Sequence, residues 1–226
     1  MKTEIQKCSE DILYFKEKYL GLQKDKIQDE ILRLLQKNKR LNIETGRNSK
    51  KTTAAAIYIL HNFLFEEEFN AGIISHSLVY SKDILAKIVN LYNQLPNEFK
   101  TKVKITKTSF YNESNKSKVI VDNIDDKTFI GFNIDFILLD NAAVIQKTKL
   151  KLFFDYIIKT FETSQILIND DIQIKTYAPN FVEWDGSFNE TFKDEEPKKV
   201  KRPIKNTGFK QFIKNIIEKL FNIIKR

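Results

Sequence analysis

The sequence predicts an α/β protein whose mainly parallel sheet is flanked by helices. Short apolar runs at 41–43, 70–76 and 134–140 are typical of buried strands. Longer segments with helical spacing lie between them, so strand and helix alternate along the chain. With 42% hydrophobic and 30% charged residues among 226, the composition is that of a globular chain with one good-sized core. The ligand site of such a sheet lies at the carboxyl ends of its strands.

Helices are expected where apolar residues recur every three to four positions. The segment at 52–65 is alanine-rich and nearly all apolar, as in a helix buried against a sheet. His61 on this segment is expected to be a packed core residue rather than a ligand. The other expected helices cover residues 9–20, 22–35, 81–95 and 149–161, and Pro96 closes the third of these.

Residues 103–124 change to the alternating pattern of a β-hairpin. Apolar and polar residues alternate at 103–110 and again at 118–121, on either side of a polar turn at 112–117. The hairpin is expected as an insertion in the α/β order.

A polar turn joins the first strand to the helix at 52–65. Phosphate binding at such a turn needs backbone N–H groups at a helix N-terminus, a lysine and a hydroxyl for Mg²⁺, which is the P-loop pattern G-x-x-x-x-G-K-[ST]. Lys51 and Thr52 match its last two positions, but Thr45 and Lys50 stand at the two glycine positions. Glycine before the lysine permits any φ and a close approach to phosphate, and a lysine there loses both advantages.

The apolar run at 134–140 ends in Asp140, as in a Walker B strand whose last aspartate holds Mg²⁺ through water. In ATPases of this kind a glutamate that positions or deprotonates the attacking water comes next, and Asn141 occupies its place. An amide can orient water but cannot take its proton at neutral pH. The pair therefore predicts a metal site beside an impaired water-activating group.

These motifs resemble those of tailed-phage terminase large subunits, the motors that pump DNA into capsids, whose P-loops read like S-R-Q-x-G-K-T. Residues 46–52 read G-R-N-S-K-K-T, with Asn48 at the family's glutamine and Lys50 at its glycine. The family's acidic motif, D-E-x-A, corresponds to Asp140 and the three residues after it, about ninety residues beyond the P-loop. The resemblance covers roughly residues 9–182 and implies a P-loop NTPase-type fold with an inserted β-hairpin.

The resemblance implies ATP and Mg²⁺ as ligands and assigns residues to them by motif position. Gln23 matches the glutamine that reads the adenine edge in the family, but a solvated surface glutamine explains it equally well. Thr52 and Asp140 would hold the metal. The other assignments are Arg47 and Asn141 as catalytic residues and Gly46, Asn48, Ser49, Lys50, Lys51, Thr52 and Thr53 as nucleotide-binding residues.

Residues 171–180 are expected to form a strand that ends in a turn. Its ending resembles the S/T-x-P-N element with which terminases couple the nucleotide state to movement, which would give coupling roles to Thr176, Pro179 and Asn180. One residue is added between Thr176 and Pro179, and an ordinary Pro-Asn turn explains the sequence equally well.

The positive charge lies at the end of the chain. The net charge is +8, but residues 197–226 hold ten Lys or Arg and one acid, which leaves 28 basic and 29 acidic residues for 1–196. We therefore divide the chain into a domain at 1–192, a charged linker at 193–206 and a basic amphipathic helix at 207–226. The apolar face at 209–224 would dock on the same protein, on a partner or second copy, or on an anionic membrane or nucleic-acid surface.

Composition also argues against several classes of protein. A single cysteine, Cys8, excludes an internal disulfide and a cysteine metal cluster, and with only two histidines a zinc site is not expected. No apolar run approaches the ~20 residues that span a bilayer, and the N-terminus lacks the apolar segment of a signal peptide. We expect the chain in the cytoplasm of the cell that makes it, a host cell if a phage encodes it.

Two hypotheses of different classes follow. The first is a terminase-like ATPase domain for viral DNA packaging, with impaired or absent hydrolysis and no nuclease domain, whose partners by resemblance are double-stranded DNA and a viral portal or packaging protein. The second is a non-enzymatic scaffold or binding protein that acts through its basic tail and amphipathic helix. A third, an active ATPase in which Lys50, Glu44 or Asp135 compensates for the changes, has no positive support in the sequence.

Overall fold

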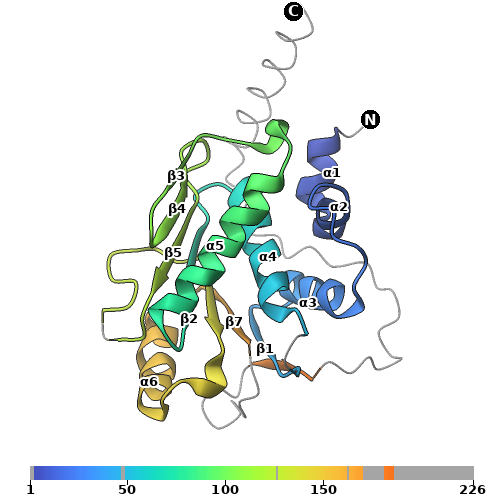
Figure 1. Ribbon diagram of the computed structural model, residues 1–226. Helices are drawn as coiled ribbons and strands as arrows, with labels where there is room; N and C mark the ends of the chain where they lie inside the picture. Colours follow the sequence, from blue (N-terminus) through green and yellow to red (C-terminus); the bar gives the residue numbers. More distant parts are fainter. Residues whose placement is uncertain (1–2, 47–48, 126, 162, 170–180, 186–226) are drawn as a thin grey trace, which may run out of the picture.

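An eight-stranded sheet forms the centre of the protein in a computed structural model that describes residues 3–46, 49–125, 127–161, 163–169 and 181–185. The strand order is β3-β4-β5-β2-β6-β7-β1-β8, and all neighbours from β5 to β8 pair in parallel. The mainly parallel sheet is therefore confirmed (Figure 1). The strands are β1 (Arg40–Ile43), β2 (Asn70–Ser75), β3 (Val103–Ile105), β4 (Ser109–Asn112), β5 (Lys118–Asp122), β6 (Phe136–Asp140), β7 (Gln165–Asn169) and β8 (Val182–Trp184).

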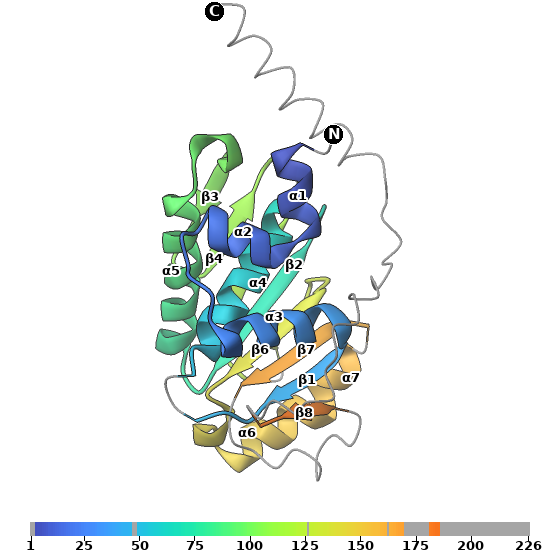
Figure 2. The same ribbon diagram turned by 90° about the vertical axis from the view of Figure 1, so that its right-hand side faces the viewer.

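Helices cover both faces of this sheet (Figure 2). Side chains of one strand alternate between the faces: in β6, Phe136 and Leu138 join the larger core cluster, whereas Ile137 and Leu139 join the smaller one. The larger cluster packs under α1 (Glu4–Glu10), α2 (Ile12–Lys18), α3 (Lys26–Lys37), α4 (Lys51–Phe65) and α5 (Leu78–Gln94). The smaller one packs under α6 (Lys147–Leu152), the π-helical turn Phe153–Ile157 and α7 (Ile158–Thr160).

The first expected helix is wrong in its boundaries. Residues 9–20 do not form one helix, because Asp11 ends α1 and begins α2 with an extended φ of −128°. Its carboxylate accepts hydrogen bonds from the backbone N–H groups of Leu13 and Tyr14, which is the ordinary geometry of an N-cap. The aspartate was counted as an acid of the first turn, but it breaks the helix.

The expected hairpin is present and is more divided than its alternation suggested. The run at 103–110 bends at Thr106, whose Oγ1 accepts hydrogen bonds from the backbone N–H groups of Thr108 and Ser109. This turn separates β3 from β4, which pair antiparallel, and β4 pairs antiparallel with β5. Because β5 pairs in parallel with β2, the hairpin extends the main sheet at one edge.

The remaining helices begin and end close to their expected positions. The expected helix at 149–161 corresponds to α6, the π-helical turn and α7 together. Strand β7 was not predicted, while the expected strand at 171–180, the linker at 193–206 and the helix at 207–226 lie outside the described residues. Within the part of the chain that the structure describes, every helix is too short or too polar to cross a bilayer.

The connection from β5 to β6 packs against β2. A Cβ atom on Gly72 would lie 2.4 Å from the ring of Phe129, so only glycine leaves room for this ring. Phe129 is 1% exposed and joins the smaller core cluster. Gly72 is therefore required by packing rather than by its backbone conformation.

His61 on α4 is a buried core residue, as expected. Its Nε2 lies 2.8 Å from the main-chain oxygen of Cys8, and its ring contacts the edges of Phe15 and Phe65. Burial lowers the pKa of His61 to about 4, because the charged imidazolium would lose its hydration.

This burial predicts a loss of stability at mildly acidic pH. The unfolded chain protonates His61 near its ordinary pKa of 6.5 and the folded chain only near 4, so the free energy of unfolding falls as the pH falls between these values. The loss from this residue is about 3 kcal/mol. Chemical denaturation of the protein and of His61→Gln, which keeps an amide donor and does not titrate, measures it. Parallel pH profiles for the two proteins would contradict the assignment.

Candidate functional site

The turn at 44–50 connects β1 to α4 and keeps the backbone of a P-loop at its last position. Lys50 has φ 60° and ψ 17°, the left-handed conformation that glycine adopts without strain. Thr45 Oγ1 and Ser49 Oγ lie 2.6 Å apart across the turn. The lysine therefore holds a conformation that the motif assigns to glycine, at a cost of about 1–2 kcal/mol.

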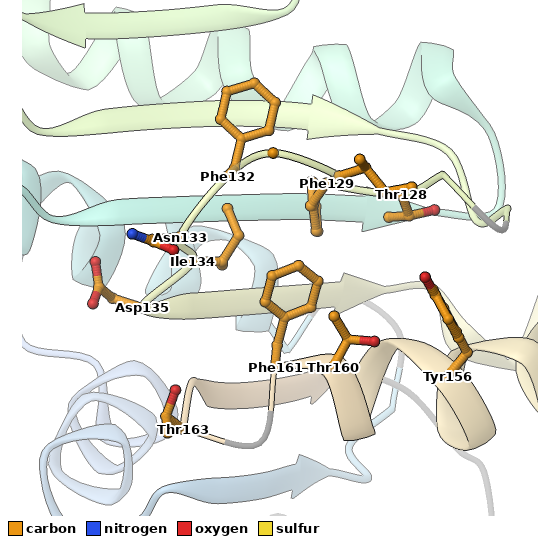
Figure 3. A pocket seen from close by; sticks show the side chains of 12 residues that line it. Thr128, Phe129, Phe132, Asn133, Ile134, Asp135, Tyr156, Thr160, Phe161 and Thr163 are labelled. Atoms are coloured by element: carbon orange, nitrogen blue, oxygen red, sulfur yellow. The ribbon is translucent and has the colours of Figure 1, made fainter.

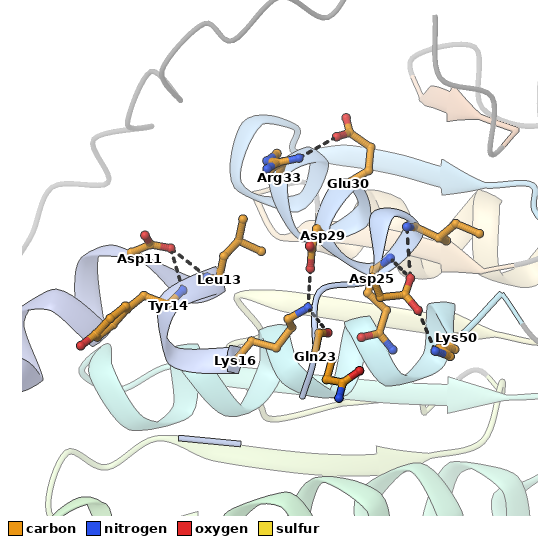
Figure 4. A network of polar contacts seen from close by, with 12 residues as sticks. Asp11, Leu13, Tyr14, Lys16, Gln23, Asp25, Asp29, Glu30, Arg33 and Lys50 are labelled. Carbon is orange, nitrogen blue, oxygen red and sulfur yellow. Dashed lines mark hydrogen bonds and ion pairs between the residues drawn. The ribbon is translucent and has the colours of Figure 1, made fainter. Parts of the chain in front are cut away.

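The side chain of Lys50 is directed out of the turn. Its Nζ donates to Asp25 Oδ2 at 2.7 Å, and 59% of the side chain is exposed (Figure 4). The ammonium group of Lys50 lowers the pKa of the Asp25 carboxyl below its ordinary value. The charge added at the glycine position is thus matched by an acid on a neighbouring element.

The predicted lysine, threonine and aspartate come together at the carboxyl ends of the strands. Lys51 Nζ donates to the main-chain oxygen of Thr45, at the opposite end of the same turn. Thr52 Oγ1 donates to the carboxylate of Asp140, at 3.0 Å from Oδ1 and 3.3 Å from Oδ2. This contact joins the first turn of α4 to the last residue of β6.

Two polar residues that the sequence analysis missed surround Asp140. Asn169, the last residue of β7, donates from Nδ2 to Asp140 Oδ1 at 2.7 Å. Ser75, the last residue of β2, donates from Oγ to the main-chain oxygen of Asp140 at 2.9 Å. Both lie level with Asp140, because β2 and β7 flank β6 in register. Asn169 could have been found by the signal that identified Asp140, since it also ends a short apolar run.

Asn141 follows β6 in the left-handed conformation, with φ 55° and ψ 45°. Asparagine is among the residues that adopt this conformation most readily. The residue is partly exposed at the same sheet edge as Asp140, so its amide is open to solvent beside the predicted metal site.

The atoms around Thr52 and Asp140 fit Mg²⁺, which prefers oxygen ligands and usually keeps several waters. Asn169 Oδ1 is buried without a hydrogen-bond partner among the described residues, so it can accept from a water of such a shell. In the described part of the chain no three His, Cys, Asp or Glu side chains are grouped to hold a metal ion. Water and phosphate oxygens would therefore complete the shell of Thr52 and Asp140.

The other predicted residues are placed less closely. Gln23 is exposed two residues before Asp25, and Gly46 is exposed in the turn. Thr53 Oγ1 accepts from Lys87 Nζ on α5 at 3.3 Å, so this hydroxyl faces α5. The residues that lie outside the described part of the chain are Arg47, Asn48, Thr176, Pro179 and Asn180.

Of the two acids considered as substitutes for the missing glutamate, Asp135 lies at the wrong edge. It precedes β6 and accepts from the backbone N–H of Asn70 at 2.8 Å, so the length of the strand, about 16 Å, separates it from Asp140. Glu44 follows β1 at the correct edge, where its Oε1 accepts from Asn42 Nδ2 at 2.7 Å.

A pocket of about 420 Å³ lies away from this site (Figure 3). It is lined by the loop at 128–135 and by the end of the α6–α7 segment, with Phe132, Tyr156 and Phe161 among its aromatic residues. Asp135 and Thr163, which also line it, precede β6 and β7, so the pocket opens at the amino ends of these strands. It is therefore separate from the polar cluster at the carboxyl ends.

Comparison with solved structures places the fold among phage terminase ATPase domains. The large terminase ATPase domain of Thermus phage P74-26 is similar with a TM-score of 0.58 and 20% identity, over 70% of this chain and 68% of that one. The HK97 bacteriophage large terminase gives 0.60 and 15%, over 82% and 45%. The large terminase of another thermophilic bacteriophage, in complex with ADP, gives 0.54 and 11%, over 72% and 45%.

The matched region thus spans less than half of the HK97 protein and of the ADP-bound terminase. No protein-family model matches the chain, and no curated protein sequence matches it significantly. The expected P-loop NTPase-type fold is confirmed by the structural similarity.

The left-handed Lys50 leads to a prediction about stability. Lys50→Gly and Lys50→Ala both remove the ammonium group, but only glycine adopts φ 60° without strain. We expect the glycine variant to be more stable than the alanine variant by about 1 kcal/mol in urea unfolding. Equal stabilities would contradict the conformation of this residue.

Proposed function

We propose that this chain is the ATPase-type motor domain of a viral DNA-packaging terminase. It binds Mg-ATP at the turn between β1 and α4 and hydrolyses it slowly or not at all. The observation that carries the proposal is the contact of Thr52 with Asp140, beside Lys51 at the start of α4. The fold similarity to terminase ATPase domains, one of them in complex with ADP, supports the same assignment.

The start of α4 supplies the groups that bind a polyphosphate. The first backbone N–H groups of a helix have no partner within it and attract anions. Lys51 would exchange the main-chain oxygen of Thr45 for phosphate oxygens, and Gly46, Ser49 and the unplaced Asn48 would contribute backbone groups of the turn. Gln23 would read the base. Bound Mg²⁺, held by Thr52 directly and by Asp140 through water, would neutralise charge on the phosphates.

Slow hydrolysis follows from Asn141. Its amide can hold a water in line with the terminal phosphate but cannot accept the proton of that water at neutral pH. Arg47 would stabilise the transferred phosphoryl group, and Thr176, Pro179 and Asn180 would couple this step to movement; these roles rest on motif positions alone. Double-stranded DNA and viral packaging proteins are the proposed partners.

A second function is favoured by the charge distribution. Ten basic residues and one acid in 197–226 would let a tail bind DNA or a partner while the domain serves as a scaffold. In that case the geometry around Lys51 would be retained for folding and not for nucleotide. The first experiment below separates the two functions.

Calorimetry of the full chain with Mg-ATP tests nucleotide binding. We expect binding that Lys51→Ala weakens by at least about 100-fold, because a charge-assisted contact with phosphate is lost from a partly buried position. Lys107→Ala, which removes an exposed lysine at the turn between β3 and β4, is the matched control and should bind normally. Absent binding, or binding that Lys51→Ala leaves unchanged, would reject the ATPase-type function and favour the scaffold.

Restoring the missing carboxylate tests the role of Asn141. General-base catalysis contributes about 10²–10⁴-fold, so Asn141→Glu should raise steady-state release of phosphate by up to about 100-fold. Asp135→Asn, which removes an acid at the opposite edge of the sheet, should leave the rate unchanged. A rate that does not respond to Asn141→Glu would show that the amide is not what limits hydrolysis.

A further inference from the structure

The loop before α3 is held from two sides by lysines of other elements. From α2, Lys16 Nζ donates to the main-chain oxygen of Gln23 at 3.1 Å and forms an ion pair with Asp29 (Figure 4). Lys16 is completely buried, and a buried ammonium persists only where such partners satisfy it. The loop at 21–25 is therefore anchored at Gln23 on the body of the domain.

The second attachment runs to the turn that begins α4. Asp25 divides its carboxylate between two tasks: Oδ1 accepts from the backbone N–H groups of Ile27 and Gln28 as the N-cap of α3, and Oδ2 accepts from Lys50 Nζ. The N-cap bonds fix the carboxylate, so Lys50 meets a preorganised partner. Among the described residues, this is the ion pair that connects the loop at 21–25 with the turn at 44–50.

We propose that the Asp25–Lys50 ion pair ties the loop that carries Gln23 to the P-loop and so positions the base-reading side of the nucleotide site. We call this pair the clasp. In this account the lysine at the glycine position has a function: its left-handed backbone aims the side chain away from the phosphates and toward Asp25. Asp25 and Lys50 are positioning residues, and their role in nucleotide selection rests on the proposed function.

Two substitutions remove the charges with little other change. Asp25→Asn keeps the N-cap, since asparagine caps helices as well as aspartate does. Lys50→Asn keeps a residue that tolerates the left-handed conformation. Asp11→Asn is the matched control, because Asp11 caps α2 with the same two backbone bonds and has no ion pair within the described residues.

Amide hydrogen exchange of the full chain without nucleotide tests the clasp directly. A partly exposed ion pair contributes up to about 1 kcal/mol, so exchange at 21–25 should accelerate about two- to five-fold in Asp25→Asn and in Lys50→Asn. The double variant should show the same acceleration as either single variant, because both remove one interaction. Unchanged exchange, additive effects, or an equal acceleration in Asp11→Asn would overturn the proposal.

The ratio of Mg-ATP to Mg-GTP affinity tests the positioning role. We expect this ratio to fall about two- to five-fold in both single variants, without a further fall in the double variant. An equal change for both nucleotides would show that Lys50 acts on the phosphates and would overturn the positioning role. If the unaltered protein binds neither nucleotide, the proposed function and the positioning role fail together, while the exchange result still decides whether the clasp exists.

Discussion

The hydrogen bond between Thr52 and Asp140 is the contact on which the functional account depends. It joins the helix that follows the polar turn to the central strand β6, across most of the described sequence. Its geometry requires the parallel order of β1, β7 and β6, since only parallel strands bring these carboxyl ends to one edge. Ser75 and Asn169 on the flanking strands then fix Asp140 from both sides. Sheet topology thus determines where a metal and a phosphate chain would meet.

Lys50 shows how a motif can change in sequence and keep its shape. The substitution loses the conformational freedom of glycine, which costs about 1–2 kcal/mol for the left-handed residue. The ion pair with Asp25 offsets part of that cost, although a half-exposed pair contributes at most about 1 kcal/mol. The extra cation therefore stays outside the turn. Asn141 is a different kind of change, because it keeps a backbone conformation suited to asparagine and removes a chemical group.

The sequence was sufficient for the elements that have strong periodicity. The apolar helix α4, strands β2 and β6, and the order of hairpin and acidic motif follow from local patterns that tertiary structure did not override. Local patterns could not show that Asp11 breaks a helix or that Asn169 lies beside Asp140, because these depend on capping geometry and on strand order. The Asp25–Lys50 contact is equally long-range, joining residues 25 positions apart on different elements.

The most direct test of the account is a crystal structure of the full chain with Mg²⁺ and a non-hydrolysable ATP analogue. The account predicts that the phosphates lie at the first turn of α4 with Lys51 on their oxygens and that the metal lies between Thr52 and Asp140. Lys50 should remain on Asp25. A nucleotide bound elsewhere, such as in the aromatic pocket at the amino ends of β6 and β7, or none at a saturating concentration, would contradict it.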